Sequence, residues 1–458
     1  MLTTLQLAYQ HTKGDYLRKL IAIAIPITIQ NILISSRGLV DAVMLAQLGE
    51  AEIAAIGVAS KAAFIAIIMI VGMTTGGSLL IAQYWGANEK GGIRRSTALT
   101  VMTSLMLASG IVAFFLMFSE NVMALATDSQ DIIQYGSDYL VYSSFSLIAI
   151  AYAASMAAAL RSVHKPGVST FFSGVGIFAN VFLNWVLIFG NLGFPEMGIK
   201  GAAIATVMSA FLEAILLTIY VYGRKHLLAF SFYDIVSSLQ IDEIKRFVSL
   251  SLPVTINFLF WSGGLFAYNV IMGQTGSQGL AALSAINPVE SMSLSFLIGI
   301  ASASSVLVGN QIGAKKYEEV FYQAIGTCLF NFIIGVICSA SLWLMKGFVL
   351  GAFTGLSPET YAIAEKFYLI FCIGIMVRAI PITTIVGILR AGGDIRYCFY
   401  QDIIAQWGIA VPLSFLGAFW FGLEPHWVYL LFLSEELFKC FTASYRMLTK
   451  KWIKNLIS

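Results

Sequence analysis

Charged residues are scarce in this chain. Only 11% of its 458 residues are Asp, Glu, Lys or Arg, whereas 58% are hydrophobic. The net charge is only +3 and no run of five or more like charges occurs, so nothing supports nucleic-acid binding. This composition predicts a polytopic helical membrane protein.

Cysteine is also scarce, and the common catalytic motifs are missing. The five cysteines have neither paired nor metal-ligand spacing, and the four histidines are scattered near predicted loops, so we expect no disulfide framework and no metal site. The lack of GxxxxGK[ST] excludes an ATP-driven pump formed by this chain alone, and the lack of HExxH and GxSxG argues against a hydrolase. We therefore expect a protein that is not an enzyme and that uses no cofactor.

Long apolar runs dominate what is present. About 20 apolar residues span a bilayer as a helix, and runs of this length predict twelve transmembrane helices. Their ranges are 18–46, 52–84, 94–118, 136–160, 167–190 and 200–222, then 245–273, 279–311, 318–346, 360–389, 396–421 and 427–449. The organisation predicted is an N-terminal six-helix bundle over 1–222, a cytoplasmic connector over 223–244 and a C-terminal six-helix bundle over 245–458.

Basic residues in the short loops predict the orientation. Most of them lie in loops on the side of both termini, and the opposite loops hold only Lys200, Lys346 and Lys366. Cytoplasmic loops carry the excess of Lys and Arg, so both termini are predicted to be cytoplasmic. The first apolar run has no cleavage pattern and is longer than a signal-peptide core, so we expect it to be retained.

The two sets of runs are related by an internal repeat. Matches at a constant offset of 227 residues include Pro26 with Pro253, Thr28 with Thr255, Gly72 with Gly299, and Gly86-Ala87 with Gly313-Ala314. Later the register slips by two residues, and Leu160-Arg161 matches Leu389-Arg390. Two parallel halves with a site between them are typical of transporters.

The first run carries Arg37 and Asp41 at membrane depth. An ionised group in hydrocarbon costs from about 3 to over 10 kcal/mol, so such residues usually face a bundle interior or a water-filled cavity. Asp41 is therefore the first functional candidate. Two alternatives remain: Arg37, four residues earlier on the same helix face, neutralises it, or the carboxylate reaches the membrane interface.

Polar residues in the fifth and sixth runs are further candidates. Asn180 and Asn184 are one helical turn apart and project from one face, where amide oxygens bind a cation or accept a hydrogen bond from a protonated carboxyl. Thr206 is another oxygen donor. The alternative for all three is helix–helix packing.

Other residues within the runs suggest a hinge and a cavity. Pro26 and Pro253 interrupt their helices at equivalent positions, as static kinks or as moving hinges. Glu435 and Lys439 stand four residues apart, and simple pairing is one reading of them. The residues predicted to line a substrate cavity are Gln30, Asn31, Arg37, Tyr268 and Arg378.

Several segments together resemble the multidrug and toxic compound extrusion (MATE) family over essentially the whole chain. They are IPITIQNIL and GLVDAVMLAQLG in the first run, AQYWGAN, ALRSVHKPG, NWVLIFG, MGIKGAAIATV and GILRAGGDIR. The resemblance implies two pseudo-symmetric six-helix bundles arranged as a V around a central cavity. It also implies export of amphipathic, often cationic compounds in exchange for H⁺ or Na⁺ by alternating access.

The resemblance also assigns roles by position. Asp41 matches the acidic residue of a first-half cation site, and Pro26 matches the bending point of the first helix. The other residues carried over to that cation site are Asn180, Asn184 and Thr206.

Two departures from the family pattern are visible. Trp261 and Ala379 stand where many members have acidic residues, so we expect the second-half cation site to be absent. Asn184 stands where some members have aspartate, and Arg37 is not expected at its position. Fewer anionic oxygens then remain for sodium, and the arginine opposes protonation of Asp41.

We therefore predict a monomeric multidrug antiporter in the bacterial cytoplasmic membrane, coupled to H⁺ or Na⁺ through Asp41. Its expected partners are an amphipathic small molecule and membrane lipids. The alternative is a flippase for lipids or lipid-linked saccharides, because Arg378 and Lys61 suit an anionic headgroup. A passive channel fits less well, since the two-half repeat with its prolines favours alternating access.

Overall fold

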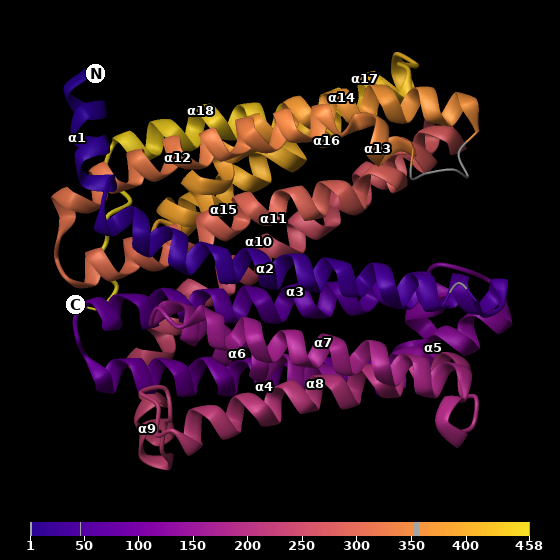
Figure 1. The fold of residues 1–458 in the computed structure, drawn as a ribbon, viewed down its shortest axis with the longest axis horizontal. Helices are drawn as coiled ribbons and strands as arrows, with labels where there is room; N and C mark the ends of the chain where they lie inside the picture. Colours follow the sequence, from indigo (N-terminus) through magenta and orange to yellow (C-terminus); the bar gives the residue numbers. More distant parts are fainter. Residues whose placement is uncertain (1, 46, 352–356, 458) are drawn as a thin grey trace. The chain divides into compact units, whose positions relative to one another are not determined.

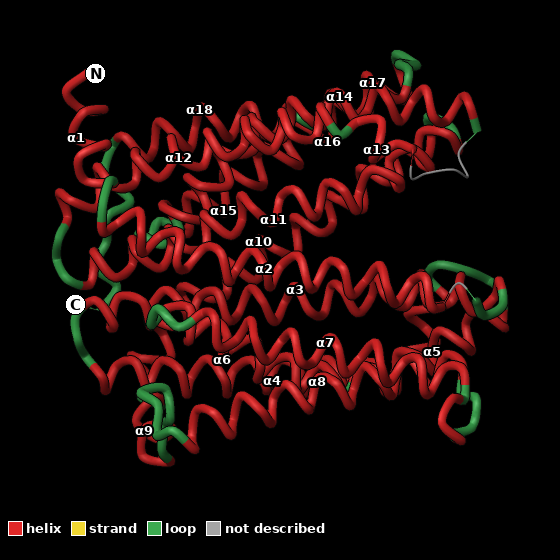
Figure 2. The backbone as a smooth tube through the Cα atoms, viewed as in Figure 1, coloured by secondary structure: helices red, strands yellow, loops and turns green. Residues whose placement is uncertain are grey.

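The computed structural model describes residues 2–45, 47–351 and 357–457. Within these ranges every regular element is a helix and no strand occurs (Figure 2). The apolar sequence explains this, because only helices satisfy their own backbone hydrogen bonds within one segment in a bilayer. The prediction of an all-α membrane protein is confirmed.

The chain forms two compact units. Residues 32–258 form one, called unit 2 below, and residues 1–31 together with 259–458 form the other, called unit 1. These units and the two halves of the sequence are not the same sets of residues. The linear bundles over 1–222 and 245–458 remain a prediction from the repeat.

Unit 2 contains the long helices of the first sequence half (Figure 1). Its core lies among α3, α4, α5 and α6, where Ala59, Ile70, Phe115 and Leu140 are buried. Its elements are the later part of α2 (Asp15–Leu45), α3 (Glu50–Gly86), α4 (Lys90–Ala124), α5 (Gln130–Ser144), α6 (Ser146–Ser162), α7 (Pro166–Phe189), η1 (Asn191–Gly193), α8 (Gly198–Gly223), α9 (Phe232–Ser238) and the first part of α10 (Ile241–Gln274).

Unit 1 contains the helices of the second sequence half. Its largest core includes Tyr368, Phe367 and Phe371 of α14. Its elements are α1 (Leu2–Thr12), the first part of α2, the later part of α10, α11 (Ser277–Gly313), α12 (Tyr317–Leu344), α13 (Lys346–Gly351), α14 (Pro358–Pro381), η2 (Ile382–Leu389), α15 (Ile395–Ile403), η3 (Ile404–Ala410), α16 (Val411–Phe415), η4 (Leu416–Trp420), α17 (Pro425–Phe432) and α18 (Ser434–Leu448).

Two helices each contribute to both units. The boundary falls after Asn31 in α2 and after Phe258 in α10. These positions are 227 residues apart, which is the offset of the sequence repeat, and each lies five residues after its proline. Each half of the repeat therefore gives the first part of its first helix to the unit formed by the other half.

The same close contact occurs once in each unit. In unit 2, a Cβ atom on Gly72 would lie 2.6 Å from the Thr255 Cα; in unit 1, a Cβ on Gly299 would overlap the Thr28 Oγ1. Glycine is required at both places because a side chain has no room. Since Gly72 matches Gly299 and Thr28 matches Thr255 at the offset of 227, the contacts are equivalent.

The number of membrane-spanning helices is the point at which structure and prediction differ. Among the described residues, ten helices are long and apolar enough to cross a membrane, and α5 with α6, bent by 45°, makes an eleventh. The twelfth predicted run, 427–449, falls on α17 and α18, which are not among them. The run is divided into helices of 8 and 15 residues, each too short to span a bilayer, and α18 also carries Glu435, Glu436, Lys439 and Arg446.

Candidate functional site

Asp41 is part of a polar site in unit 2. Asn184 of α7 donates a hydrogen bond from Nδ2 to the Asp41 Oδ1 at 2.6 Å. Arg37, one turn earlier on α2, places its Nε 3.6 Å from the Asp41 Oδ2. The structure thus brings Asp41, Asn184 and Arg37 together, and Arg37 faces the carboxylate.

The asparagines on α7 are enclosed but incompletely hydrogen-bonded. Asn180 is 0% exposed and Asn184 is 2% exposed. The Asn184 Nδ2 lies 3.5 Å from the Asn180 Oδ1, while the Asn180 Nδ2 and the Asn184 Oδ1 have no hydrogen-bond partner. Leaving a buried polar atom unpaired costs about 1–3 kcal/mol. Such atoms are tolerated where a site must bind something or change its hydrogen bonds.

A second carboxylate belongs to this polar region. Glu213 of α8 is half-buried and accepts a hydrogen bond from the Ser173 hydroxyl of α7 at 2.5 Å. Its side chain also packs on Gly176, where a Cβ atom would lie 3.2 Å from the Glu213 Oε2. The charges of Arg37 and Glu213 are close enough to attract each other. The polar face of α7 thus runs from Ser173 near Glu213 to Asn184 beside Asp41.

Sequence reasoning missed Glu213. It is a carboxylate within an apolar run, the same signal that identified Asp41. Its hydrogen-bond partner Ser173 lies 40 residues away in the sequence, so local spacing does not reveal the pair.

The remaining predicted residues of the cation site and hinge lie elsewhere. Thr206 is half-buried on α8, and among the described residues its hydroxyl makes no hydrogen bond to Asp41 or to either asparagine. Pro26 lies within α2, which continues through it as one helix. Gln30 is buried and Asn31 is half-buried, both in the part of α2 that belongs to unit 1.

Tyr268 and Arg378 belong to a network of charged side chains in unit 1. The Tyr268 hydroxyl donates to the Glu435 Oε2 at 2.6 Å. Arg378 of α14 donates to Glu290 of α11, and its Nε lies 3.5 Å from the Glu436 Oε1. The predicted pairing of Glu435 with Lys439 is present at 2.5 Å.

The network also includes acidic residues that sequence reasoning did not single out. Glu290 and Asp402 both lie in apolar runs, but their partners are distant in the sequence. Trp261 and Ala379 occupy the positions where the resemblance places acidic residues. Unit 1 therefore contains buried carboxylates, supplied by other helices than those in the family pattern.

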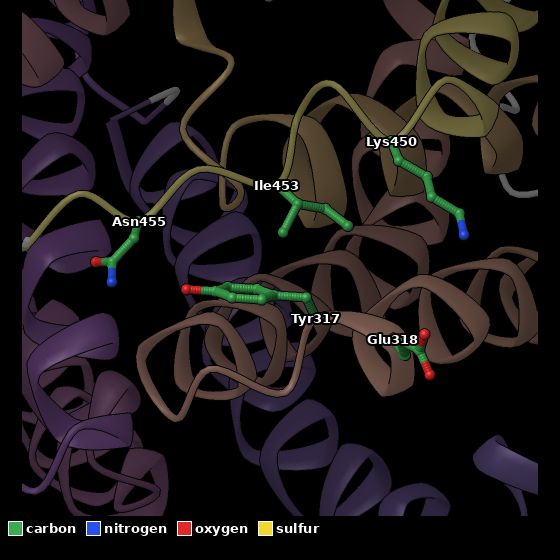
Figure 3. Close-up of a pocket in the computed structure, with 5 residues that line it drawn as sticks. All are labelled: Tyr317, Glu318, Lys450, Ile453 and Asn455. Atoms are coloured by element: carbon green, nitrogen blue, oxygen red, sulfur yellow. The ribbon is translucent and has the colours of Figure 1, made fainter.

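A pocket of about 320 Å³ lies at the N-terminal end of α12, beneath the segment that follows α18 (Figure 3). It is lined by Tyr317, Glu318, Lys450, Ile453 and Asn455. None of the predicted site residues lines it. Within the described ranges, no group of three or more His, Cys, Asp or Glu is arranged to hold a metal ion.

Comparison with known proteins gives a consistent result. The family model described as MatE matches residues 26–186 and again residues 253–416. The two matches begin at Pro26 and Pro253, in agreement with the repeat. The probable multidrug resistance protein NorM of Listeria innocua is 23% identical over 428 residues, which cover 90% of this chain and 92% of the relative. A probable NorM protein of Thermotoga maritima is 24% identical, with 96% of this chain and 94% of that protein covered.

Solved structures share the fold. The crystal structure of MATE in complex with MaL6 matches with a TM-score of 0.87 at 18% identity, covering 98% of this chain and 99% of that one. The outward-facing conformation of a multidrug resistance MATE family transporter matches with a TM-score of 0.87 at 18% identity, covering 96% and 98%.

Proposed function

Because the chain belongs to the MatE family of multidrug and toxic compound extrusion proteins, we propose that it is an antiporter that exports amphipathic, often cationic molecules. We propose further that protons taken up at Asp41 drive the export. The observation that carries this proposal is the hydrogen bond between Asn184 and Asp41 inside a membrane-spanning helix bundle, beside buried amide atoms that lack partners.

The groups around Asp41 favour a proton over sodium as the coupling ion. A sodium ion needs several oxygen ligands, and an oxygen-rich site with little positive charge suits it best. Here the Asp41 carboxylate faces the Arg37 guanidinium at 3.6 Å and an N–H group of Asn184 at 2.6 Å. Both donors would repel a metal cation, whereas a proton needs only one carboxylate oxygen.

Asn184 is suited to respond to the proton. While Asp41 is ionised, the amide N–H of Asn184 donates to it. Once Asp41 is protonated, its O–H becomes a donor, and Asn184 must present its Oδ1 instead. The Asn184 Oδ1 has no partner at present, so turning the amide breaks no hydrogen bond made by that oxygen.

Glu213 explains how Asp41 can take up a proton although the positive charge of Arg37 lies beside it. An arginine paired with Asp41 alone would hold the carboxylate ionised. Arg37 pairs with Asp41, and its charge also reaches Glu213, so with both carboxylates ionised the region carries one negative charge in excess, which one proton neutralises. When Asp41 takes up that proton, Glu213 remains as a nearby anion for Arg37.

The coupling step would then act on α2. Asp41 lies in unit 2, whereas Pro26 lies on the same helix in unit 1. A change in the hydrogen bonds of Asp41 moves one end of this helix, and Pro26 serves as the hinge because its ring removes one helical hydrogen bond. Substrate and proton must favour different conformations, since otherwise neither shifts the equilibrium.

Several finer points belong to the same proposal. The protein is a multi-pass protein of the bacterial inner membrane, with both termini in the cytoplasm. Flipping of lipids or lipid-linked saccharides is the alternative function. Its support was the positive charge of Arg378 and Lys61, but Arg378 pairs with Glu290 and Glu436, which weakens this alternative.

The decisive experiment uses purified protein in liposomes loaded with a fluorescent cationic dye. Efflux is compared under a proton gradient without sodium and under a sodium gradient at equal pH. We expect proton-driven efflux that is lost in Asp41→Asn. The matched control is Asp138→Asn, because Asp138 pairs with Lys200 at a partly exposed position.

Each outcome has a distinct meaning. Full proton-driven efflux by a properly inserted Asp41→Asn protein would overturn the role of Asp41. Efflux driven only by the sodium gradient would show that the coupling ion is a metal cation and not a proton. Movement of labelled lipid without dye efflux would establish the flippase alternative.

A further inference from the structure

Unit 1 contains a connected set of charged side chains that the proposed function does not use. The members come from α10, α11, α14, α15, α18 and the turn after η2. They are Tyr268, Glu290, Arg378, Arg390, Asp402, Glu435, Glu436 and Lys439.

One end of the network is neutral. Asp402 accepts a hydrogen bond from Arg390 at 2.9 Å and lies 3.1 Å from the Lys439 Nζ. Glu435 accepts from Lys439 at 2.5 Å and from the Tyr268 hydroxyl at 2.6 Å. The two carboxylates, Asp402 and Glu435, are thus balanced by two cations, Arg390 and Lys439, at hydrogen-bonding distance.

The other end is not neutral. Arg378 is the cation shared by two carboxylates, Glu290 and Glu436. The side chains of this triad are 16%, 16% and 18% exposed. One negative charge is therefore in excess at a largely buried position, and an uncompensated charge is costly inside a membrane protein.

The two glutamates are held unequally. Glu290 accepts a direct hydrogen bond from the Arg378 Nη1. Glu436 is only 3.5 Å from the Arg378 Nε, and that Nε is enclosed yet donates no hydrogen bond. The charge of Lys439 also acts on Glu436, but Lys439 makes its close contacts with Asp402 and Glu435. Glu436 therefore has the longest ion-pair contact of the four carboxylates in the network.

We propose that the triad of Glu290, Arg378 and Glu436 is a second proton-binding site, and that Glu436 carries the proton. One proton on Glu436 leaves Glu290 and Arg378 as a neutral pair. A metal cation is disfavoured because the guanidinium lies between the two carboxylates. The charged and titratable groups around Glu436 are Arg378 of α14, Glu290 of α11, Asp402 of α15, Tyr268 of α10, and Glu435, Lys439 and Cys440 of α18.

This site is separate from the one at Asp41. Glu290, Arg378 and Glu436 all belong to unit 1, whereas Asp41, Asn184 and Glu213 all belong to unit 2. The inference rests on the proposed function only in that protons drive the transport. It adds a second proton to each transport cycle, carried by a different unit.

The first test measures proton binding without transport. Infrared difference spectra of the purified full-length protein, recorded across a pH titration, report the carbonyl band of a protonated carboxyl group. We expect Glu436→Gln to lose a band that the wild type shows. Glu318→Gln is the matched control, because Glu318 is an exposed glutamate of the same unit. Retention of every carboxyl band in Glu436→Gln would overturn the proposal.

The second test measures the number of protons per dye molecule in liposomes. The pH gradient that just balances a fixed dye gradient gives this ratio. If each unit carries one proton, Glu436→Gln lowers the ratio to about half, since only the Asp41 site then responds to the gradient. An unchanged ratio in Glu436→Gln, with dye efflux lost in Asp41→Asn, would overturn this proposal and leave the proposed function intact. A lowered ratio in Glu436→Gln, with full proton-driven efflux in Asp41→Asn, would overturn the role of Asp41 and leave the triad intact.

A second variant covers the case in which Glu436→Gln fails to fold. Glu290→Gln leaves Glu436 as the anionic partner of Arg378, so the excess charge disappears. We expect Glu290→Gln to lose the same carbonyl band and to lower the proton ratio equally. A Glu290→Gln protein with the wild-type band and ratio would contradict the shared-charge model.

Discussion

Gly72 lies so close to Thr255 that a Cβ atom on the glycine would be 2.6 Å from the Thr255 Cα. Both residues belong to unit 2, but they come from different halves of the repeat. The obstacle is backbone, which cannot rotate away as a side chain does. The contact therefore fixes how the first part of α10 packs on α3.

Substitution of this glycine is expected to destabilise unit 2. Gly72→Ala should cost about 1–3 kcal/mol, because an added methyl group in a closely packed core forces the backbone to shift. The measurement is the thermal unfolding midpoint in detergent. Gly57→Ala is the control on the same helix, since a Cβ there meets nothing within 4 Å. Equal midpoints for the two variants would contradict the close contact.

Asn184 is expected to matter more than its neighbour. Loss of a hydrogen bond to a charged group costs about 1.5–3 kcal/mol, so Asn184→Ala should slow proton-driven dye efflux about tenfold or more. Asn180→Ala is the comparison, because the hydrogen bond to Asp41 comes from Asn184, whereas Asn180 accepts one from Asn184. A larger loss in Asn180→Ala than in Asn184→Ala would contradict the assignment.

Glu213 is expected to set the pH range of transport. In Glu213→Gln, Arg37 has Asp41 as its anionic partner and holds it ionised, so efflux should require a lower pH than in the wild type. The measurement is the dye efflux rate across a pH series. Ser173→Ala removes the hydrogen bond to Glu213 but keeps its charge, so a smaller change in the same assay is expected. An unshifted profile in Glu213→Gln would separate Glu213 from the coupling site.

Asp394 anchors the end of the chain. It lies in the turn between η2 and α15, is 3% exposed, and accepts hydrogen bonds of 2.6 Å from Arg446 and from Lys454. Burial opposes its ionisation, but these hydrogen bonds and positive charges outweigh burial and hold the pKa of Asp394 below its usual value. The buried Trp452 lies against Gly392 in the same turn.

The stability that Asp394 provides should depend on pH. A carboxylate whose pKa is lower in the folded state stabilises the fold above its unfolded pKa, and this contribution is lost as the pH falls through the folded value. At neutral pH, Asp394→Asn should lower the free energy of unfolding by about 1.5–3 kcal/mol, the usual value for hydrogen bonds to charged groups. The difference in unfolding midpoint from the wild type should shrink on acidification. A difference that stays constant with pH would rule out the ionised carboxylate as its source.

Features within one helix could be read from the sequence. The four-residue spacings offered pairing as one alternative for Arg37 with Asp41 and for Glu435 with Lys439, because such residues share a helix face, and both pairs are present in the structure. The repeat offset also located the glycines and threonines that meet in both units, although it did not say that they touch.

Contacts between distant helices could not be read from a single sequence. Glu290 and Arg378 are 88 residues apart, and no local spacing indicates that they meet. For the same reason, the sequence does not show which helices belong to which unit, since apolar periodicity shows that a helix is buried but does not identify its neighbours. The twelfth run was predicted as a span from its length, but in the structure it is two helices, with a charged face on α18.

The division of α2 between the units affects how the protein is synthesised. All of unit 2 has been made once the ribosome passes Phe258, so this unit can close early. The first 31 residues cannot pack into unit 1 at that point, because Thr327, which forms a hydrogen bond with Tyr16, is synthesised 311 residues after it. At about 5–20 residues per second, this delay is roughly 15 to 60 s. During that time the start of α2 lacks its final helix neighbours and must be protected by lipid, the insertion machinery or a chaperone.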